Sequence, residues 1–240
     1  MDHGAPIIEN LFGIPWLSID LSSAMMMVVS CLIVFILAVL ATRNLKMKPT
    51  GIQNFMEWVV DFVKKIINDS MDWRTGKVFL PLALTLITFI FISNILGVIV
   101  IGVYDGDIWW KSPTADAGVT LTLAGFMIIM TNFYGVKMRG TKKYAKSFVK
   151  PVFFILPFKL IEEFTNTMTL GFRLYGNIFA GEILLGLIAE MAFVTLPIAF
   201  IGALIPMILW QGFSLFIGAI QAFIFTTLSM VYMSHKVENH

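Results

Sequence analysis

The stretch PFKLIEEFTNTMTLGFRLYGNIFAGEILLGLIAE, residues 157–190, decides the fold class of this chain. It is apolar over most of its length, and as one α-helix it would be roughly 50 Å long at about 1.5 Å per residue. The hydrocarbon core of a bilayer is only about 30 Å thick. The segment therefore predicts a membrane helix that must tilt steeply or bend.

The composition of the whole chain agrees with a membrane location. Of the 240 residues, 58% are hydrophobic and 13% are charged, whereas soluble proteins have about 45–50% and about 25%. The single cysteine, Cys31, excludes a disulfide-rich secreted module, and the net charge of +2 gives no case for a nucleic-acid partner. No Lys or Arg precedes the first apolar run, so we expect a retained membrane helix there and not a cleaved signal peptide.

The apolar segments predict an all-α polytopic membrane protein, a single membrane domain over residues 1–240. Five crossings are expected, at residues 21–41, 78–102, 118–136, 157–190 and 198–235. The last two form a long, strongly tilted helical hairpin with its turn at Thr195-Leu196-Pro197. Residues 52–73 place apolar and charged side chains on opposite faces, which is typical of an amphipathic helix in the membrane interface. A connector outside the membrane is the alternative for that segment.

The distribution of basic residues predicts the orientation. The segments that follow the first and third crossings are rich in Lys and Arg, whereas the loop between the second and third crossings carries three Asp and one Lys. Basic loops remain on the cytoplasmic side of bacterial membranes. We therefore expect the N-terminus outside and the C-terminus in the cytoplasm.

Arg173 is the residue that most needs an explanation. It lies in the apolar 157–190 helix, where an Arg at mid-membrane costs about 2.5–3.5 kcal/mol on insertion scales, and its guanidinium cannot be deprotonated. On its own helix Glu163 lies ten residues before it and Glu182 nine residues after it, while the last crossing offers no acid in its polar row Gln211, Ser214 and Gln221. A buried charge needs a counter-ion or water. We therefore expect its carboxylate partner on another chain; the alternatives are snorkelling and binding of a lipid headgroup.

Four motifs, in order and spacing, resemble the family of subunit a of the F-type ATP synthase, in its bacterial, Bacillus-like form. They are PLALT (81–85), PTADAGVTLTLA (113–124), GFRLYGNIFAGE (171–182) and IQAFIFTTLSMVYMS (220–234). The resemblance covers most of the chain from about residue 78 onward. It implies an ion-conducting stator subunit in the bacterial plasma membrane, with two offset half-channels for protons and no catalytic activity of its own.

The resemblance also implies partners and residue roles. The partners are a rotating ring of c subunits, each with one mid-membrane carboxylate, the b subunits of the peripheral stalk, the rest of the ATP synthase complex and membrane lipid. Arg173 matches the essential arginine that holds the passing carboxylate deprotonated and blocks direct leakage. The outer proton path includes Asn177, Glu182, Ser214 and Gln221. The inner path includes Asn166 and Thr169, with Glu162 and Glu163 near its mouth.

Two departures from the family pattern affect the outer path. Ser214 stands where some relatives have His, and Gly97 where some have Asp. We therefore expect water to fill more of this path. Cofactors and metal ligands are not expected.

Two other functions are less well supported by the sequence. A secondary transporter with its own substrate site is the main alternative, but the two halves of the chain show no repeat and no pair of broken helices. A membrane-embedded hydrolase is disfavoured because the sequence has neither an HExxH motif nor a serine elbow.

Overall fold

The computed structural model describes residues 7–8, 19–43, 45–99, 102–104, 107–149, 153–194 and 197–238. Five helical segments are long and apolar enough to cross a membrane, which confirms the expected all-α polytopic architecture. They contain α1 (Leu21–Thr42), α4 (Leu80–Ile99), α5 (Ala117–Arg139), α7 (Leu156–Val194) and α8 (Pro197–Val237). The expected turn at Thr195 and Leu196 lies outside the described residues, and α8 begins at Pro197, where the fixed φ of proline suits a first helical position.

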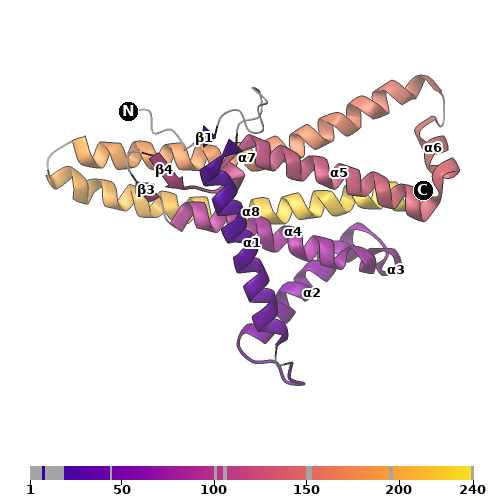
Figure 1. The fold of residues 1–240 in the computed structure, drawn as a ribbon, viewed down its shortest axis with the longest axis horizontal. Helices are drawn as coiled ribbons and strands as arrows, with labels where there is room; N and C mark the ends of the chain where they lie inside the picture. Colours follow the sequence, from indigo (N-terminus) through magenta and orange to yellow (C-terminus); the bar gives the residue numbers. More distant parts are fainter. Residues whose placement is uncertain are drawn as a thin grey trace. The chain divides into compact units, whose positions relative to one another are not determined.

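Along the chain, the shorter elements come between these helices, and Figure 1 labels α2, α3 and α6. They are α2 (Ile52–Ser70), α3 (Trp73–Gly76), α6 (Thr141–Val149), and the 3₁₀ turns η2 (Lys77–Phe79), η3 (Pro113–Ala115) and η4 (Phe153–Ile155). Two antiparallel strand pairs complete the chain, β1 (Ile7–Ile8) with β2 (Ile19–Asp20), and β3 (Gly102–Tyr104) with β4 (Asp107–Trp110).

Three of these elements differ from what the segment boundaries suggest. The second crossing helix ends at Ile99, and Gly102 already belongs to β3. The amphipathic helix α2 ends at Ser70 because Met71 is extended, with φ −157°. The basic segment after α5 forms helix α6. Whether α2 lies in a membrane interface, and whether the chain forms one membrane domain, remain predictions.

The chain divides into two compact units. The first comprises Met1–Leu40, Thr88–Asp116 and Tyr175–Ala222, and the second comprises Ala41–Ile87, Ala117–Leu174 and Phe223–His240. The helices α4, α7 and α8 each contribute one part to each unit.

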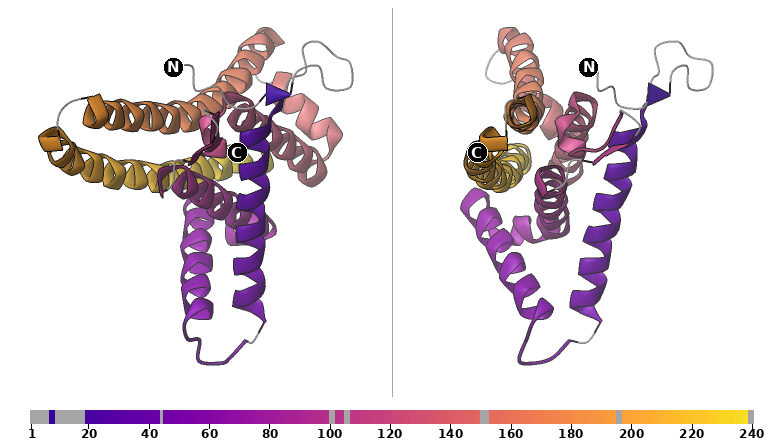
Figure 2. Two further views of the ribbon diagram at one scale, coloured as in Figure 1. Left: turned by 60° about the vertical axis from the view of Figure 1, so that its left-hand side comes forward. Right: turned by 90° about the vertical axis from the view of Figure 1, so that its left-hand side faces the viewer.

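In the first unit, parts of α7 and α8 run antiparallel, as Figures 1 and 2 show in orange and yellow. The indole Nε1–H of Trp210 donates to the Gly181 carbonyl at 3.0 Å, which ties α8 to α7. Gln211 donates from Nε2 to the Val98 carbonyl of α4 at 2.6 Å. These side-chain bonds to backbone carbonyls fix the helices in a setting where an unmade hydrogen bond is costly.

In the second unit, α7 packs closely on α5. A Cβ added to Gly171 would lie 2.8 Å from Leu121 Cδ2 and 3.2 Å from Leu121 Cα, so the absence of a side chain allows this approach. Leu170 and Leu174 lie on the same buried face and are 2% and 1% exposed. Phe79 is fully buried with its ring edge-on to Tyr134, at 5.0 Å between centroids. This packing determines which face of α7 remains uncovered.

Candidate functional sites

Arg173 lies on the uncovered face of α7 in the second unit. Its helix packs through Leu170, Gly171 and Leu174, whereas Thr169, Phe172 and Arg173 are exposed. None of the ion pairs among the described side chains includes Arg173. A permanent cation therefore lies on an exposed helix face without an ion-pair partner from the described part of this chain.

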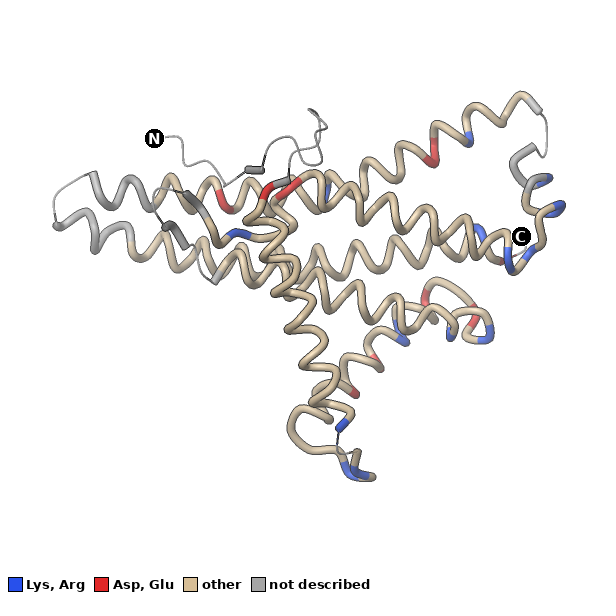
Figure 3. Tube along the Cα trace, viewed as in Figure 1, with Lys and Arg blue, Asp and Glu red and all other residues tan. Residues whose placement is uncertain are grey.

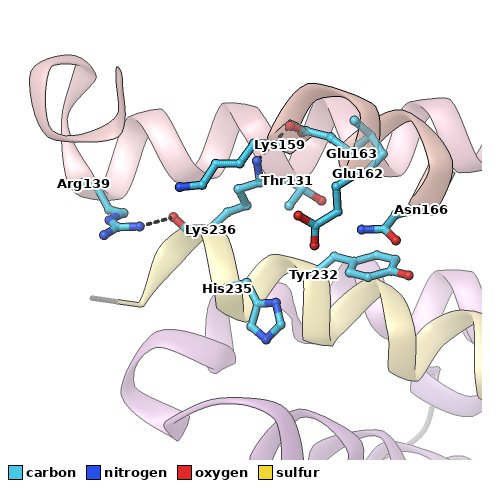
Figure 4. A pocket seen from close by; sticks show the side chains of 10 residues that line it. Thr131, Arg139, Lys159, Glu162, Glu163, Asn166, Tyr232, His235 and Lys236 are labelled. Atoms are coloured by element: carbon cyan, nitrogen blue, oxygen red, sulfur yellow. Dashed lines mark hydrogen bonds and ion pairs between the residues drawn. The ribbon is translucent and has the colours of Figure 1, made fainter. Parts of the chain in front are cut away.

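A cavity of about 260 Å³ lies in the second unit, between the start of α7 and the end of α8. Figure 4 shows the carboxylate of Glu162 and the amide of Asn166 directed toward Tyr232 of α8. The other lining residues are Ile128, Thr131, Arg139, Lys159, Glu163, His235 and Lys236. The cavity thus combines three of the four residues expected on the inner path. Thr169, the fourth, is exposed on the same side as Arg173 and is not among the lining residues.

Glu162 and Glu163 have different surroundings although they are adjacent. Both carboxylate oxygens of Glu163 are engaged: Oε1 accepts from Asn132 Nδ2 at 2.6 Å, and Oε2 accepts from Lys236 Nζ at 2.9 Å. Glu162 is exposed and lines the cavity. Glu163 is therefore bound as an anchor between three helices, and Glu162 is the carboxylate open to the cavity.

Tyr144 of α6 completes this cluster. Its hydroxyl donates to Asn132 Oδ1, which fixes the orientation of the amide whose nitrogen donates to Glu163. Burial and the negative charge of Glu163 raise the pKa of Tyr144 to about 12, against the opposing effect of Arg139. The phenol therefore stays protonated and keeps its donor over the whole physiological pH range.

Basic residues surround this end of the second unit. Figure 3 shows Lys and Arg gathered where α5 ends and α6 begins. They include Lys137, Arg139, Lys142, Lys143 and Lys146. Arg139 Nη1 donates to the Lys236 carbonyl at 3.4 Å, which links this basic segment to the end of α8.

A second cavity, of about 290 Å³, lies in the first unit and contains three residues expected on the outer path. Asn177, Glu182 and Ser214 all line it, together with Gly97, Val98, Ile178, Ala180, Gly181, Leu184, Leu185, Trp210 and Ile217. The Ser214 hydroxyl is buried and has no hydrogen-bond partner among the described residues. The cavity is large enough to hold water, and Asn177, Glu182 and Ser214 give it polar groups to bind; such a water would satisfy that hydroxyl. Gln221, seven residues after Ser214 on α8, is 6% exposed and is not among the lining residues.

Glu182 is held by Ser112, a residue that no sequence motif had indicated. The backbone N–H of Ser112 donates to Glu182 Oε1 at 2.9 Å. The Ser112 hydroxyl in turn bonds the Ser93 carbonyl at 2.9 Å, and Ser112 is fully buried. The motif PTADAG begins one residue later, so its position in the sequence marked the segment but not its contact with Glu182.

Gly97 is explained by this same segment. A Cβ added to Gly97 would lie 2.3 Å from Ser112 Cβ, 2.6 Å from its backbone N and 2.7 Å from its Cα. The space of a side chain at position 97 is therefore filled by Ser112. Some relatives have an Asp at this position, and the expectation was that water replaces its carboxylate. In this chain the Ser112 backbone takes part of that space.

Asp20 and Lys111 form an ion pair at the start of α1. Asp20 Oδ1 also accepts from the backbone N–H groups of Ser22 at 3.0 Å and Ser23 at 3.2 Å, as an N-capping residue does. Burial of Asp20 opposes its ionisation, but the hydrogen bonds from Lys111 and Ser23 outweigh burial and lower its pKa. Lys111 entered the sequence-based expectations only as the one basic residue of its loop, and its pairing with Asp20 was not expected.

The model of one protein family, described as ATP synthase A chain, matches residues 24–234. The chain belongs to this family. The ATP synthase subunit a of Oceanobacillus iheyensis is 58% identical over 239 residues, which cover 100% of this chain and 99% of that protein. The subunits a of Lysinibacillus sphaericus and Bacillus subtilis are 56% and 53% identical over 239 and 246 residues, again with 100% and 99% coverage.

Membership in the ATP synthase A chain family confirms the resemblance seen in the motifs. The chain is the proton-translocating stator subunit of an F-type ATP synthase, and it is part of that complex in the bacterial membrane. A secondary transporter is not supported. Among the described residues, no group of three His, Cys, Asp or Glu side chains is placed to hold a metal ion.

Proposed function

We propose that this chain conducts protons through two offset aqueous half-channels and that Arg173 couples this conduction to rotation of a ring of c subunits. The observation that carries the proposal is the position of Arg173, exposed on α7 and absent from every ion pair among the described side chains. A charge that cannot be neutralised requires a carboxylate or water close by.

The two acids of α7 that are nearest to Arg173 in the sequence already have partners, which supports a carboxylate partner on another chain. Glu163 already pairs with Lys236, and Glu182 accepts a hydrogen bond from Ser112. A ring carboxylate that passes within about 4–6 Å of a guanidinium is favoured in its charged form. Arg173 thereby keeps the passing carboxylate deprotonated and, since it cannot relay a proton itself, prevents leakage between the paths.

The outer path uses the first-unit cavity. Protons enter beside Asn177 and Ser214, and Glu182 accepts them before they reach the ring; Gln221 extends the polar row of α8 beyond Ser214. The supporting observations are the shared cavity of Asn177, Glu182 and Ser214 and the unpartnered Ser214 hydroxyl.

The inner path uses the second-unit cavity. Glu162 and Asn166 face this cavity; the Glu162 carboxylate takes up the released proton and the Asn166 amide hydrogen-bonds water there, whereas Glu163 anchors α7 to α5 and α8. Thr169 lies one turn before Arg173 on the exposed face, where it borders the ring carboxylate. The basic residues at the end of α5 and in α6 support a cytoplasmic position for this cavity.

The same proposal includes the orientation of the chain in the membrane and its further partners. The N-terminus lies outside the cell and the C-terminus in the cytoplasm. Besides the ring, the partners are the b subunits of the peripheral stalk and membrane lipid. The chain is not catalytic by itself, because ATP chemistry belongs to other subunits of the complex.

Photocross-linking of the intact complex tests the ring contact. A photoreactive residue in place of Thr169, which is exposed, is expected to cross-link to the carboxylate-bearing ring subunit. The same residue in place of Leu170, which is 2% exposed, is expected to react only within this chain. Cross-links from position 169 to lipid alone would contradict the proposal and favour a lipid-facing Arg173.

A further inference from the structure

We propose that the backbone amide of Ser112 is a positioning group for Glu182 in proton transfer, an inference that rests on the outer path proposed above. Its N–H donates to Glu182 Oε1 at 2.9 Å, and Glu182 lines the first-unit cavity. A backbone amide cannot titrate, and it cannot rotate away as a side chain can. It therefore holds one carboxylate oxygen in place at any pH.

The segment that carries this amide is itself fixed by buried contacts. Thr114 Oγ1 donates to Asn94 Oδ1 at 2.6 Å, and Asn94 Nδ2 donates to the Gly218 carbonyl at 2.8 Å, which joins the segment to α4 and α8. Ser112 and Thr114 are fully buried, and Asn94 is 1% exposed. Such a satisfied polar network is rigid, because breaking any bond would leave a buried polar group unpaired.

Close packing adds a second constraint on the segment. The backbone of Ser112 lies directly against Gly97 of α4, with no space for a Cβ between them. Nearby, Trp110 Nε1 donates to the Leu96 carbonyl at 2.9 Å. The amide of Ser112 is thus set by α4 on one side and aimed at α7 on the other.

The charges around Glu182 are few among the described residues. From the same segment, Lys111 interacts with Glu182 electrostatically, and its ammonium is paired with Asp20. The α4 and α8 residues lining this cavity, Gly97, Trp210 and Ser214 among them, are uncharged. Among the hydrogen bonds of the described residues, the one that the Glu182 carboxylate accepts comes from the Ser112 N–H. A hydrogen bond to the charged form of a carboxyl group favours that form, so loss of the donor favours the protonated form.

Two substitutions at one position separate the amide from the side chain. Ser112 has φ −65° and ψ 130°, backbone angles that proline adopts, although the proline Cδ would displace Glu182 Oε1 from its present position. Ser112→Pro removes the N–H, whereas Ser112→Ala keeps the N–H and removes only the hydroxyl. Replacement of Ser112 by the corresponding α-hydroxy acid changes the N–H to an ester oxygen with little change in shape, and serves if the proline variant does not assemble.

The readout is ATP synthesis by the complex in proteoliposomes at a fixed membrane potential, with the pH varied on the side that the outer path faces. Wild type and Ser112→Ala are expected to share one pH profile. In Ser112→Pro and the ester variant, the alkaline limb is expected to move up by about one pH unit, as loss of a charge-assisted hydrogen bond implies. An ester variant with the wild-type profile would overturn the inference.

Glu182→Gln, measured in parallel, separates failure of the outer path from failure of the role of the Ser112 amide. If this variant keeps wild-type rates, the outer path through Glu182 is wrong, and so is the role of Ser112 that depends on it. If Glu182→Gln loses activity while the ester variant keeps the wild-type profile, only the role of the Ser112 amide is wrong.

Discussion

Lys236 Nζ lies 2.9 Å from Glu163 Oε2, so the end of α8 is tied to the beginning of α7 by an ion pair. The Lys236 and Glu163 side chains are 25% and 16% exposed, so this ion pair is partly buried. Asn132 and Tyr144 extend the contact to α5 and α6. Three helices therefore meet at one carboxylate beside the second-unit cavity, and α6 joins them through Asn132.

The adjacent residues Glu162 and Glu163 are expected to respond differently to the same substitution. Glu162→Gln removes the carboxylate open to the cavity, so proton pumping should fall roughly 3- to 10-fold, less than the ~10²-fold of a unique acid–base group because water can partly substitute. Glu163→Gln leaves Lys236 without its counter-ion and should lower stability by about 1–3 kcal/mol. Pumping rates and thermal melting of the purified complex measure the two effects; equal behaviour of both variants would contradict the assignment.

Tyr144→Phe is expected to lower stability by about 1 kcal/mol, because Asn132 loses the hydroxyl that orients its amide. With the pKa of Tyr144 raised to about 12, ionisation of the phenol should not affect the wild type up to about pH 10. Thermal melting of both proteins at pH 7 and pH 10 measures this. A difference between wild type and Tyr144→Phe that disappears at pH 10 would show that the phenol ionises earlier than the structure implies.

Gly97→Ala is expected to destabilise the first unit by about 1–3 kcal/mol, as overpacking does. The added Cβ would meet backbone atoms of Ser112 at 2.6 and 2.7 Å, and these cannot turn aside. Gly125→Ala is the control, since a Cβ at this helical glycine would have nothing within 4 Å. Thermal melting and the yield of assembled complex report the difference. A Gly97→Ala complex as stable as the control would show that the Ser112 segment does not pack on α4.

Asp20→Asn removes a charge but keeps an oxygen that can cap α1, so it isolates the ion pair with Lys111. The pKa of Asp20 is below the ordinary 3.8 in the folded chain, so its contribution is complete above pH 3.8 and is lost as the pH falls through the lowered value. Wild type should therefore exceed the variant by about 1 kcal/mol at pH 7 and equally at pH 5. Thermal melting at both pH values checks this; a gap that narrows between pH 7 and pH 5 would contradict the lowered pKa.

The crossing helices were predictable because apolar runs and charge-free length are local properties of the sequence. The hairpin of β3 and β4 was missed although a signal existed: Asp105-Gly106 stands between segments rich in aromatic and β-branched residues, a typical turn sequence between strands. Helix α6 was missed because its lysines were used to predict orientation and not structure.

The candidate sites were predictable where their residues share a helix. Arg173, Asn177 and Glu182 follow from helical spacing and from the motif that contains them. The contact of Ser112 with Glu182 was not predictable, because it joins residues 70 positions apart through a backbone group. The distinction between Glu162 and Glu163 likewise depends on Lys236, 73 positions beyond Glu163.

The central claim is that Arg173 is the charge that couples proton movement to rotation, and ATP-driven acidification of inverted membrane vesicles tests it most directly. The Arg173→Ala complex should assemble with the ring and the catalytic head, as a pull-down would verify, yet acidification should be abolished. Acidification near the wild-type rate in the assembled Arg173→Ala complex would contradict the claim and leave Arg173 as a structural or lipid-binding residue.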